Sequence, residues 1–407
     1  MMSNVNKATA QISKIAALLF AVYPMLDYYG YGNFTLSFCL TVLLYMYTFV
    51  KLGKLPLDYP LPLISYFIYL YIARFVFSVS FGEALALSFL FVIILWGFLH
   101  RLLDFDFFIK VYRIVAFINI FAFIIQAISY ELLGYRFIFL LDFLPLTNVG
   151  AGDFDAADWS EKAMYGDRGS AFFSEPAHFV QYLVPLLIIE LFYISNKKAY
   201  LRSIVYVLTL LLLSSGNALL ALLVVALFFI FSILIKAKSV NKILYTFLFV
   251  FIAFISANYF LRTEKGQSLL ERQDELDINN PKITSGFVRV FRGYYVWDSM
   301  TMTEKIFGLN STRRIENTIN KSPVFYMFKD ELYFNGFQSI IIQTGLIGLL
   351  IISIYIFSLW HHNNLSGQCC LAVYISLSFI AAVYLSYTML LYFVIAYHLK
   401  NKKYQYI

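Results

Sequence analysis

Residues 217–236 read NALLALLVVALFFIFSILIK, and they carry no charged side chain before the final lysine. A helix needs about 20 predominantly apolar residues to cross the hydrocarbon core of a bilayer. A helix that is apolar on every face has no side to present to water, so it must be buried in protein or in lipid. The stretch therefore predicts a transmembrane helix.

The composition of the whole chain agrees with this prediction. Of the 407 residues, 61% are hydrophobic, 19% are aromatic and only 14% are charged, with a mean hydropathy of +0.73. Soluble domains carry roughly 25% charged residues, because their exterior must be hydrated. The expected fold is an all-α polytopic integral membrane protein that forms a single transmembrane domain over 1–407. The net charge of +7 is typical of basic cytoplasmic loops, and no nucleic-acid partner is expected.

Similar apolar runs recur along the chain. The candidate spans are 12–30, 34–52, 61–80, 83–100, 110–130, 175–195, 200–214, 217–236, 243–261 and 334–360. The last apolar block, 367–399, is too long for one ordinary span, and we divide it near Tyr384–Ser386 into two short helices. The expected total is about twelve spans, with eleven as the alternative.

Basic residues set the expected orientation, because lysine and arginine collect in short cytoplasmic loops. They precede the first span and follow the second, eighth and last, whereas alternate short turns such as Gly30–Asn33 and Ser80–Gly82 have none. One assignment satisfies this pattern: twelve spans, a retained first helix and both termini in the cytoplasm. It places two long connections, 131–174 and 262–333, on the outer face. Loops of this length are usually functional or disordered.

Cysteines and acidic side chains give no sign of a metal or a disulfide framework. Cys39, Cys369 and Cys370 all fall in apolar runs and are interpreted as small hydrophobic residues. The carboxylates of the long connections have no spacing typical of a metal cage. We expect neither a metal nor a cofactor.

The second long connection contains an aromatic stretch, Ser285–Thr301 (SGFVRVFRGYYVWDSMT). As a short amphipathic helix it would place Arg289 and Arg292 on one face. Such a helix is typical of a membrane interface, where the arginines reach lipid phosphates. The alternative is that they anchor a phosphate-bearing substrate. Arg313, further along, either contacts substrate or faces water.

The first long connection ends in Gly166–Gln181, which reads GDRGSAFFSEPAHFVQ. Pro176 suits the first turn of a helix, and a carboxylate at Glu175 is favoured there by the helix dipole. His178 lies three residues later and shares a face with Glu175. Arg168 adds a cation able to hold a diphosphate. The plainer interpretation is a helix cap with a histidine hydrogen-bonded to a neighbour, but ionisable groups at membrane depth are usually functional.

This stretch resembles the Wzy-type O-antigen and capsule polymerases, in which Arg–Gly–x–Phe–x–Glu–Pro is typical. The matching residues are Arg168-Gly169-Ser170-Ala171-Phe172-Phe173-Ser174-Glu175-Pro176. Further similarities follow in the same order. They are Ser214-Ser215-Gly216-Asn217, Arg289 with Arg292, Ile306-Phe307-Gly308-Leu309-Asn310, Asn335 with Gln338, and Thr344-Gly345-Leu346-Ile347-Gly348.

The resemblance implies a GT-C-like fold and a metal-independent glycosyltransferase. A growing glycan would leave undecaprenyl diphosphate and join an incoming lipid-linked repeat unit at the outer face of the bacterial inner membrane. Arg168, Arg289 and Arg292 would stabilise the diphosphate, because a departing diphosphate gathers negative charge. Glu175 or His178 would act as the base. Arg313, Asn335 and Gln338 would bind substrate.

Two other functions remain open. The related O-antigen ligases place a histidine just ahead of the position of Asn335, where this chain has Phe334, which favours a polymerase. A flippase or transporter of lipid-linked sugars would also have about twelve spans, but such proteins tend to have symmetric halves and interrupted helices. Membrane lipid, a chain-length regulator and a flippase are the expected partners.

Overall fold

The computed structural model describes residues 2–31, 34–55, 61–77, 102–139, 169–213, 215–236, 244, 285–328 and 333–400. The predicted span 83–100 lies outside this part of the chain, and so does 243–261 apart from residue 244. Arg168 and most of the first long connection also lie outside it, as do 262–284 and 329–332 of the second.

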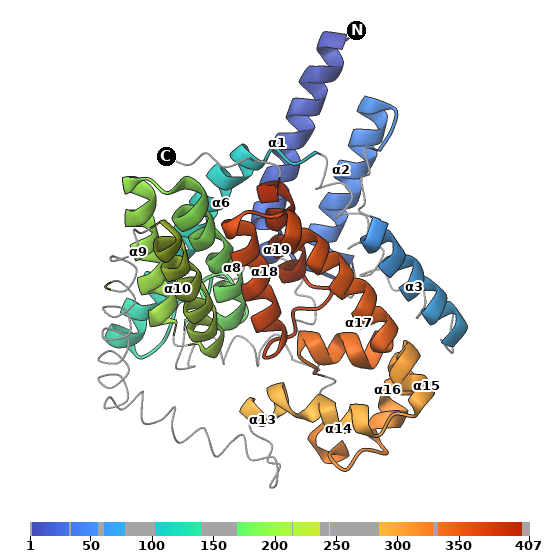
Figure 1. The fold of residues 1–407 in the computed structure, drawn as a ribbon. Coiled ribbons are helices and arrows are strands. Elements are labelled where there is room, and N and C mark those ends of the chain that lie inside the picture. The colour runs from blue at the N-terminus through green and yellow to red at the C-terminus, as the bar shows by residue number, and fades with distance from the viewer. Residues whose placement is uncertain are drawn as a thin grey trace.

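Helices dominate the described residues, and the only regular strands among them form one short hairpin (Figure 1). The elements up to residue 236 are α1 (Met2–Leu26), β1 (Gly30–Tyr31), β2 (Phe34–Thr35), α2 (Leu36–Leu52), α3 (Leu61–Phe77), α6 (Phe105–Leu133), α8 (Pro176–Ile188), the π-helix η1 (Ile189–Ile194), α9 (Lys197–Leu212) and α10 (Gly216–Lys236). The later elements are α13 (Ser285–Val290), α14 (Arg292–Asp298), α15 (Met302–Phe307), α16 (Thr312–Ile319), the 3-10 helix η3 (Phe325–Phe328), α17 (Gly336–His362), α18 (Leu365–Ser378) and α19 (Tyr387–Lys400).

Helix α8 lies at the centre of the bundle (Figure 1). Every residue from Phe179 to Ile188 is buried, so the helix is covered on all its faces. Its neighbours include α6, α9, α10, α18 and α19. A helix that is apolar on all its faces must be buried, and the centre of the bundle buries it. The start of α8 is therefore fixed from several sides.

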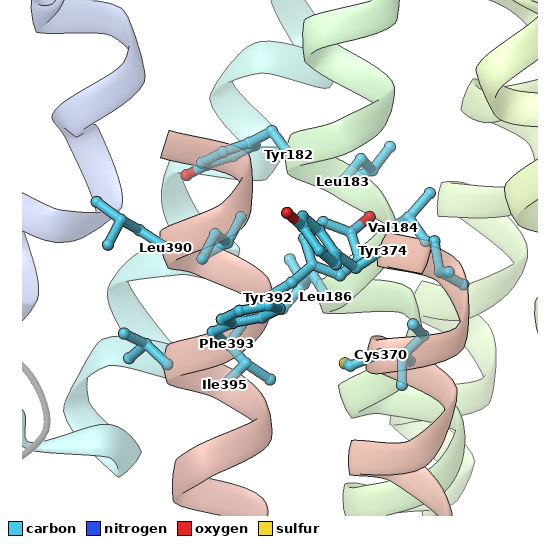
Figure 2. Packing of buried hydrophobic residues seen from close by; sticks show 14 of the residues in the cluster. Tyr182, Leu183, Val184, Leu186, Cys370, Tyr374, Leu390, Tyr392, Phe393 and Ile395 are labelled. Carbon is cyan, nitrogen blue, oxygen red and sulfur yellow. The ribbon is translucent and has the colours of Figure 1, made fainter. Parts of the chain in front are cut away.

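The last two helices pack against α8 through aromatic side chains (Figure 2). Tyr374 of α18 meets Phe393 of α19 edge to face, with ring centroids 4.7 Å apart. Residues 379–386 separate the two helices, and Leu385 in this connection has φ +49°. The predicted division of 367–399 into two helices is confirmed.

Hydrogen bonds join the termini of different helices at each of the two ends of the bundle. At one end, Tyr28, just after α1, hydrogen-bonds Ser174, just before α8, and the backbone of Gly336 at the start of α17 donates to Ala381. At the other end, Asn364 ahead of α18 donates to the Leu399 carbonyl near the end of α19. We call the first the site end, because the candidate functional residues lie there.

Residues 285–328 form a compact group of short helices, the α13–α16 subdomain, against the start of α17 (Figure 1). Phe287 and Val296 are fully buried in its own hydrophobic core. The expected single helix is therefore wrong for Ser285–Thr301. Its predicted position at a membrane interface stays a prediction. The stretch forms two helices, α13 and α14. Neighbouring helices cover side chains of both, Phe287 on α13 and Val296 on α14, so these side chains face protein.

Helix α17 is interrupted at Gly345, which has φ +66° and ψ −168°. The turn after α15 packs into this break: the Leu309 and Asn310 amides donate to the Ile342 and Gln343 carbonyls at 2.9 and 3.1 Å. The Tyr69 hydroxyl bonds the Thr344 carbonyl at 2.8 Å. The predicted span 334–360 is present but is not one straight helix, because these partners replace the missing helical hydrogen bonds.

Within the described residues, 5 helices are long and apolar enough to cross a membrane. They are Ala8–Leu26, Phe105–Leu133, Pro176–Ile194, Gly216–Ile235 and Gly336–His362. Shorter apolar helices, such as Leu36–Leu52 and Tyr387–Leu399, accompany them. The apolar helices are consistent with a membrane protein. The predicted count of about twelve spans is not confirmed, because several described helices are short and two predicted spans fall wholly or almost wholly outside the described residues.

Candidate functional site

The segment leading into α8 is held against α6 by one buried glutamine. The Gln126 side-chain oxygen accepts from the backbone amides of Ser170 and Ala171 at 3.1 and 2.8 Å, and its nitrogen donates to the Ala171 carbonyl. Ala171 adopts the left-handed region with φ +56°. These bonds satisfy backbone groups that would otherwise be buried without partners. They fix where the chain enters α8.

Glu175 and His178 stand at the start of α8, as the sequence predicts. Pro176 is the first helical residue and Glu175 is the N-cap, but the Glu175 carboxylate makes no capping hydrogen bond. Both Glu175 and His178 are exposed. The Nδ1 atom of His178 lies 2.9 Å from the Ser174 hydroxyl oxygen. A carboxylate not used as a cap and an exposed imidazole are both available to a substrate.

Arg289 of α13 approaches this pair from the other long connection. His178 lies within electrostatic range of both Glu175 and Arg289. Arg289 is half-buried, and no hydrogen bond or ion pair engages its guanidinium group among the residues that the structure describes. A cation, an imidazole and a carboxylate thus converge at the site end from segments more than a hundred residues apart.

Arg292 has a different environment from Arg289. It is 2% exposed, and it donates to the carbonyls of Met327 and Tyr333 at 2.7 and 2.5 Å. Its guanidinium group also lies 4.1 Å from the centre of the Phe328 ring. The predicted pair of arginines on one face does not occur, because Phe291 separates α13 from α14 and Arg292 turns into the core. Its contacts indicate that Arg292 holds the α13–α16 subdomain together.

Asn335 and Gln338 are buried and form a reciprocal capping box at the start of α17. Asn335 also donates to the Arg289 carbonyl at 2.7 Å, and Gln338 donates to the Val290 carbonyl at 2.8 Å. Gly293 packs so closely on Gln338 that an added Cβ would lie 2.5 Å from its side chain. The structure places these residues under Arg289, where they support its backbone.

Tyr333 is a site residue that the sequence did not point to. It lies within electrostatic range of Glu175, Arg289 and Arg292. Burial raises the pKa of its phenol and Glu175 adds to the rise, whereas Arg289, Arg292 and a hydrogen bond from the Ala382 backbone oppose it. No pattern in the sequence distinguishes this tyrosine from the other 31 of the chain's 32.

The predicted Arg313 lies away from the groups that surround His178 and is exposed on α16. Its neighbour Arg314 forms an ion pair with Glu304 at 3.2 Å. That arginine and the Thr301 hydrogen bonds lower the pKa of Glu304, although burial by itself would raise it. Arg168 lies outside the described residues, so its predicted role stays a prediction.

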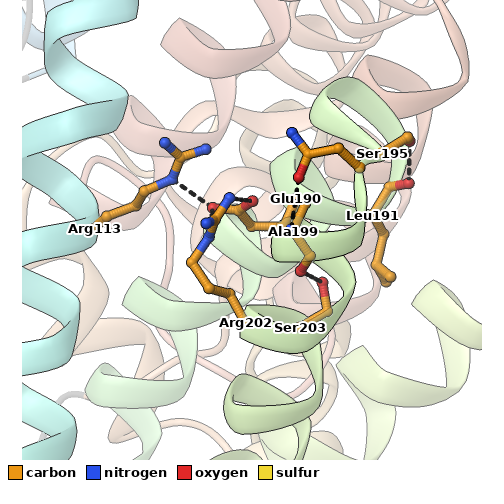
Figure 3. A network of polar contacts seen from close by, with 8 residues as sticks. Arg113, Glu190, Leu191, Ser195, Ala199, Arg202 and Ser203 are labelled. Atoms are coloured by element: carbon orange, nitrogen blue, oxygen red, sulfur yellow. Dashed lines mark hydrogen bonds and ion pairs between the residues drawn. The ribbon is translucent and has the colours of Figure 1, made fainter.

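A second charged cluster lies at the opposite end of the bundle (Figure 3). Glu190 is fully buried and accepts from Arg113 Nε at 2.5 Å and from Arg202 through Nε and a terminal nitrogen at 3.0 and 2.7 Å. The cluster joins α6, η1 and α9. Glu190 was not among the predicted site residues, although an acidic residue inside an apolar run was the available signal.

Compared with known proteins, the chain matches no protein-family model and no curated protein. Among the described residues, no three His, Cys, Asp or Glu side chains gather as a metal site would require.

Proposed function

We propose that the chain is a polysaccharide polymerase of the O-antigen or capsule type. It transfers a growing glycan from undecaprenyl diphosphate to an incoming lipid-linked repeat unit at the outer face of the bacterial cytoplasmic membrane. The observation that carries the proposal is the convergence of Glu175 and His178 with Arg289 at one end of an apolar bundle. The order of the motifs along the chain supports the same function.

The proposed reaction needs two kinds of group, and both kinds meet at this end. The leaving diphosphate gathers negative charge as the anomeric carbon–oxygen bond breaks, and a preorganised guanidinium group stabilises that charge. Arg289 has donors for this role that no described residue engages, and Arg168 would add to it. The acceptor hydroxyl is activated when a base takes its proton. Glu175 and His178 are the groups available for that step.

The orientation in the membrane is part of the proposal. The basic loops favour cytoplasmic termini and place the start of α8 outside. Lipid-linked donor and acceptor would then reach the site end with their polyprenyl tails in the bilayer. A separate chain-length regulator and a flippase are the proposed protein partners.

The interruption of α17 at Gly345 is the observation that favours a transporter, because transporters use broken helices to coordinate ions or substrates. In this chain the freed carbonyls already have partners. Leu309, Asn310 and Tyr69 bind the carbonyls of Ile342, Gln343 and Thr344, respectively, which leaves the break closed. The polymerase remains the better-supported function.

The test compares Arg289→Ala with the control Lys321→Ala, which removes an exposed cation from the same subdomain. At equal membrane levels, Arg289→Ala is expected to abolish polymer on a polysaccharide gel while lipid-linked single repeats still reach the outer face. The control should retain polymer. Long chains in the Arg289 variant would refute the role of this residue. Loss of repeats from the outer face would indicate a flippase, and long chains left on the lipid carrier would indicate a ligase.

A further inference from the structure

A chain of three hydrogen-bonded side chains lies behind the exposed face of His178. The Ser174 hydroxyl oxygen is 2.9 Å from His178 Nδ1 and 3.3 Å from the Tyr28 hydroxyl oxygen. The Ser174 backbone amide also donates to that phenol oxygen, at 3.2 Å. Tyr28 comes from the end of α1, so a residue far away in sequence reaches the start of α8.

The direction of these bonds assigns the protons on the imidazole. Ser174 has one hydroxyl proton, and it donates that proton to Tyr28. The same oxygen can therefore only accept from His178. This arrangement of the hydroxyl proton assigns a hydrogen to Nδ1, and in the neutral ring Nε2 is then left with a lone pair.

Tyr28 is suited to its place in this chain of bonds. Burial raises the pKa of its phenol to about 12, and Asp27 and Glu175 add to the rise, although the bonds from Ser174 oppose it. The phenol is therefore neutral at physiological pH. A neutral hydroxyl oxygen accepts from Ser174 without placing a second anion beside Glu175.

The charged groups around His178 come from two elements. Glu175 precedes it on the same helix start and stabilises positive charge on the ring. Arg289, on α13, opposes that charge but stabilises an anion beside the ring. Tyr333 lies within range of both Glu175 and Arg289 and is kept neutral by burial. A proton that enters the ring at Nε2 thus finds a compensating carboxylate.

We propose that Tyr28 and Ser174 are positioning residues that hold His178 with its proton on Nδ1, and that His178 Nε2 is the base of the reaction. This inference rests on the proposed function. The acceptor sugar's O–H bond breaks and its proton moves to Nε2, while the oxygen forms a bond to the anomeric carbon of the donor. The bond from that carbon to the diphosphate oxygen breaks, and its electron pair leaves with the diphosphate beside Arg289. The imidazolium then returns its proton to solvent.

The first test reads the tautomer directly, without any turnover. Full-length protein with isotope-labelled histidine is placed in lipid nanodiscs, and nitrogen NMR distinguishes a protonated nitrogen from one with a lone pair. Comparison with His178→Gln identifies the signal among the 5 histidines. We expect a protonated Nδ1 and an unprotonated Nε2 in the wild type. A proton on Nε2 of the neutral ring would overturn the proposal.

The variants separate positioning from simple stability. Ser174→Ala and Tyr28→Phe should lose the tautomer preference, whereas Ser174→Thr keeps a hydroxyl and should retain it. Ser203→Ala is the control, because that hydroxyl donates to the Ala199 carbonyl and serves only its own helix. A wild-type spectrum for both Ser174→Ala and Tyr28→Phe would overturn the positioning role.

The second test measures turnover of lipid-linked repeats against pH. Loss of a general base costs typically 10²–10⁴-fold, so His178→Gln should fall by about that factor. Ser174→Ala should lower kcat and change the pH profile, and Ser174→Thr should restore both. Undiminished turnover of His178→Gln would overturn the role as base. If the wild-type protein elongates no repeats, the polymerase proposal fails, while the tautomer measurement still tests the hydrogen-bond chain.

Discussion

Arg289 and Arg292 are three residues apart, but replacing them should affect different properties. Loss of Arg292 should lower the stability of the α13–α16 subdomain, whereas loss of Arg289 should leave that stability unchanged. The Arg292 side chain donates to two carbonyls, of Met327 and Tyr333, and stacks on Phe328. Hydrogen bonds to a charged group contribute about 1.5–3 kcal/mol each. A cation–π contact contributes about 0.5–2 kcal/mol. Because such values do not add fully, Arg292→Ala should destabilise the α13–α16 subdomain by roughly 3–5 kcal/mol.

Hydrogen–deuterium exchange of the full-length protein measures this loss locally. A change of roughly 3–5 kcal/mol corresponds to about 150- to 4,000-fold in the opening equilibrium. Amides of α14 and η3 should therefore exchange faster by about 150- to 4,000-fold in Arg292→Ala. Arg289→Ala is the matched control, because no hydrogen bond or ion pair engages that guanidinium group among the described residues.

The two variants also bear on function. Arg289→Ala should keep wild-type protection of the subdomain and lose polymer formation. Arg292→Lys should fall between wild type and Arg292→Ala, because an ammonium group lacks the planar fork that serves two carbonyls. Wild-type protection in Arg292→Ala, or equal loss of protection in both alanine variants, would refute the distinction between a structural and a substrate-binding arginine.

Three further predictions follow from other contacts. Glu190→Ala leaves the half-buried Arg113 and Arg202 without their carboxylate and should cost about 2–4 kcal/mol in stability, measured by thermal unfolding in detergent; an unchanged midpoint would contradict a stabilising ion pair. Gly345→Ala should destabilise the protein in the same assay, because the added Cβ would lie 2.4 Å from a backbone oxygen, whereas Gly216→Ala has open space and should be neutral. Glu304 has a lowered pKa in the fold, so its contribution is present above the usual value of 4.5 and is lost as pH falls below it; Glu304→Gln should remove that acid sensitivity from exchange at Thr301, and a persistent sensitivity would assign it elsewhere.

Much of the helical framework could be predicted, because a membrane helix is recognised in a sequence by the length and hydropathy of its apolar run. The spans predicted at 217–236 and 175–195 correspond to α10 and to α8 with η1. The division of 367–399 was also correct, because the length of the block exceeds one bilayer crossing. Helix starts with strong local signals, such as Pro176 after Glu175, fell where expected.

The roles of the arginines and of the α17 start could not be predicted in the same way. Arg289 and Arg292 lie in one short aromatic stretch, but the helix is interrupted at Phe291 and the Arg292 side chain enters a core. Asn335 and Gln338 have the residue types of a substrate site, yet their partners are backbone groups of α13, of α17 and of the end of α18. Periodicity cannot reveal such partners, because they come from distant parts of the chain.

The helical, apolar character of the chain and the placing of Glu175 and His178 at one helix start follow from local signals, because hydropathy, proline and helical spacing act over a few residues. Which groups meet these two side chains depends on the packing of the helices. It brings Arg289 from the second connection and Tyr28 from the first helix to His178. The physical reason is that hydrogen bonds and charge interactions depend on distance in space, and that distance is set by how the helices pack around α8.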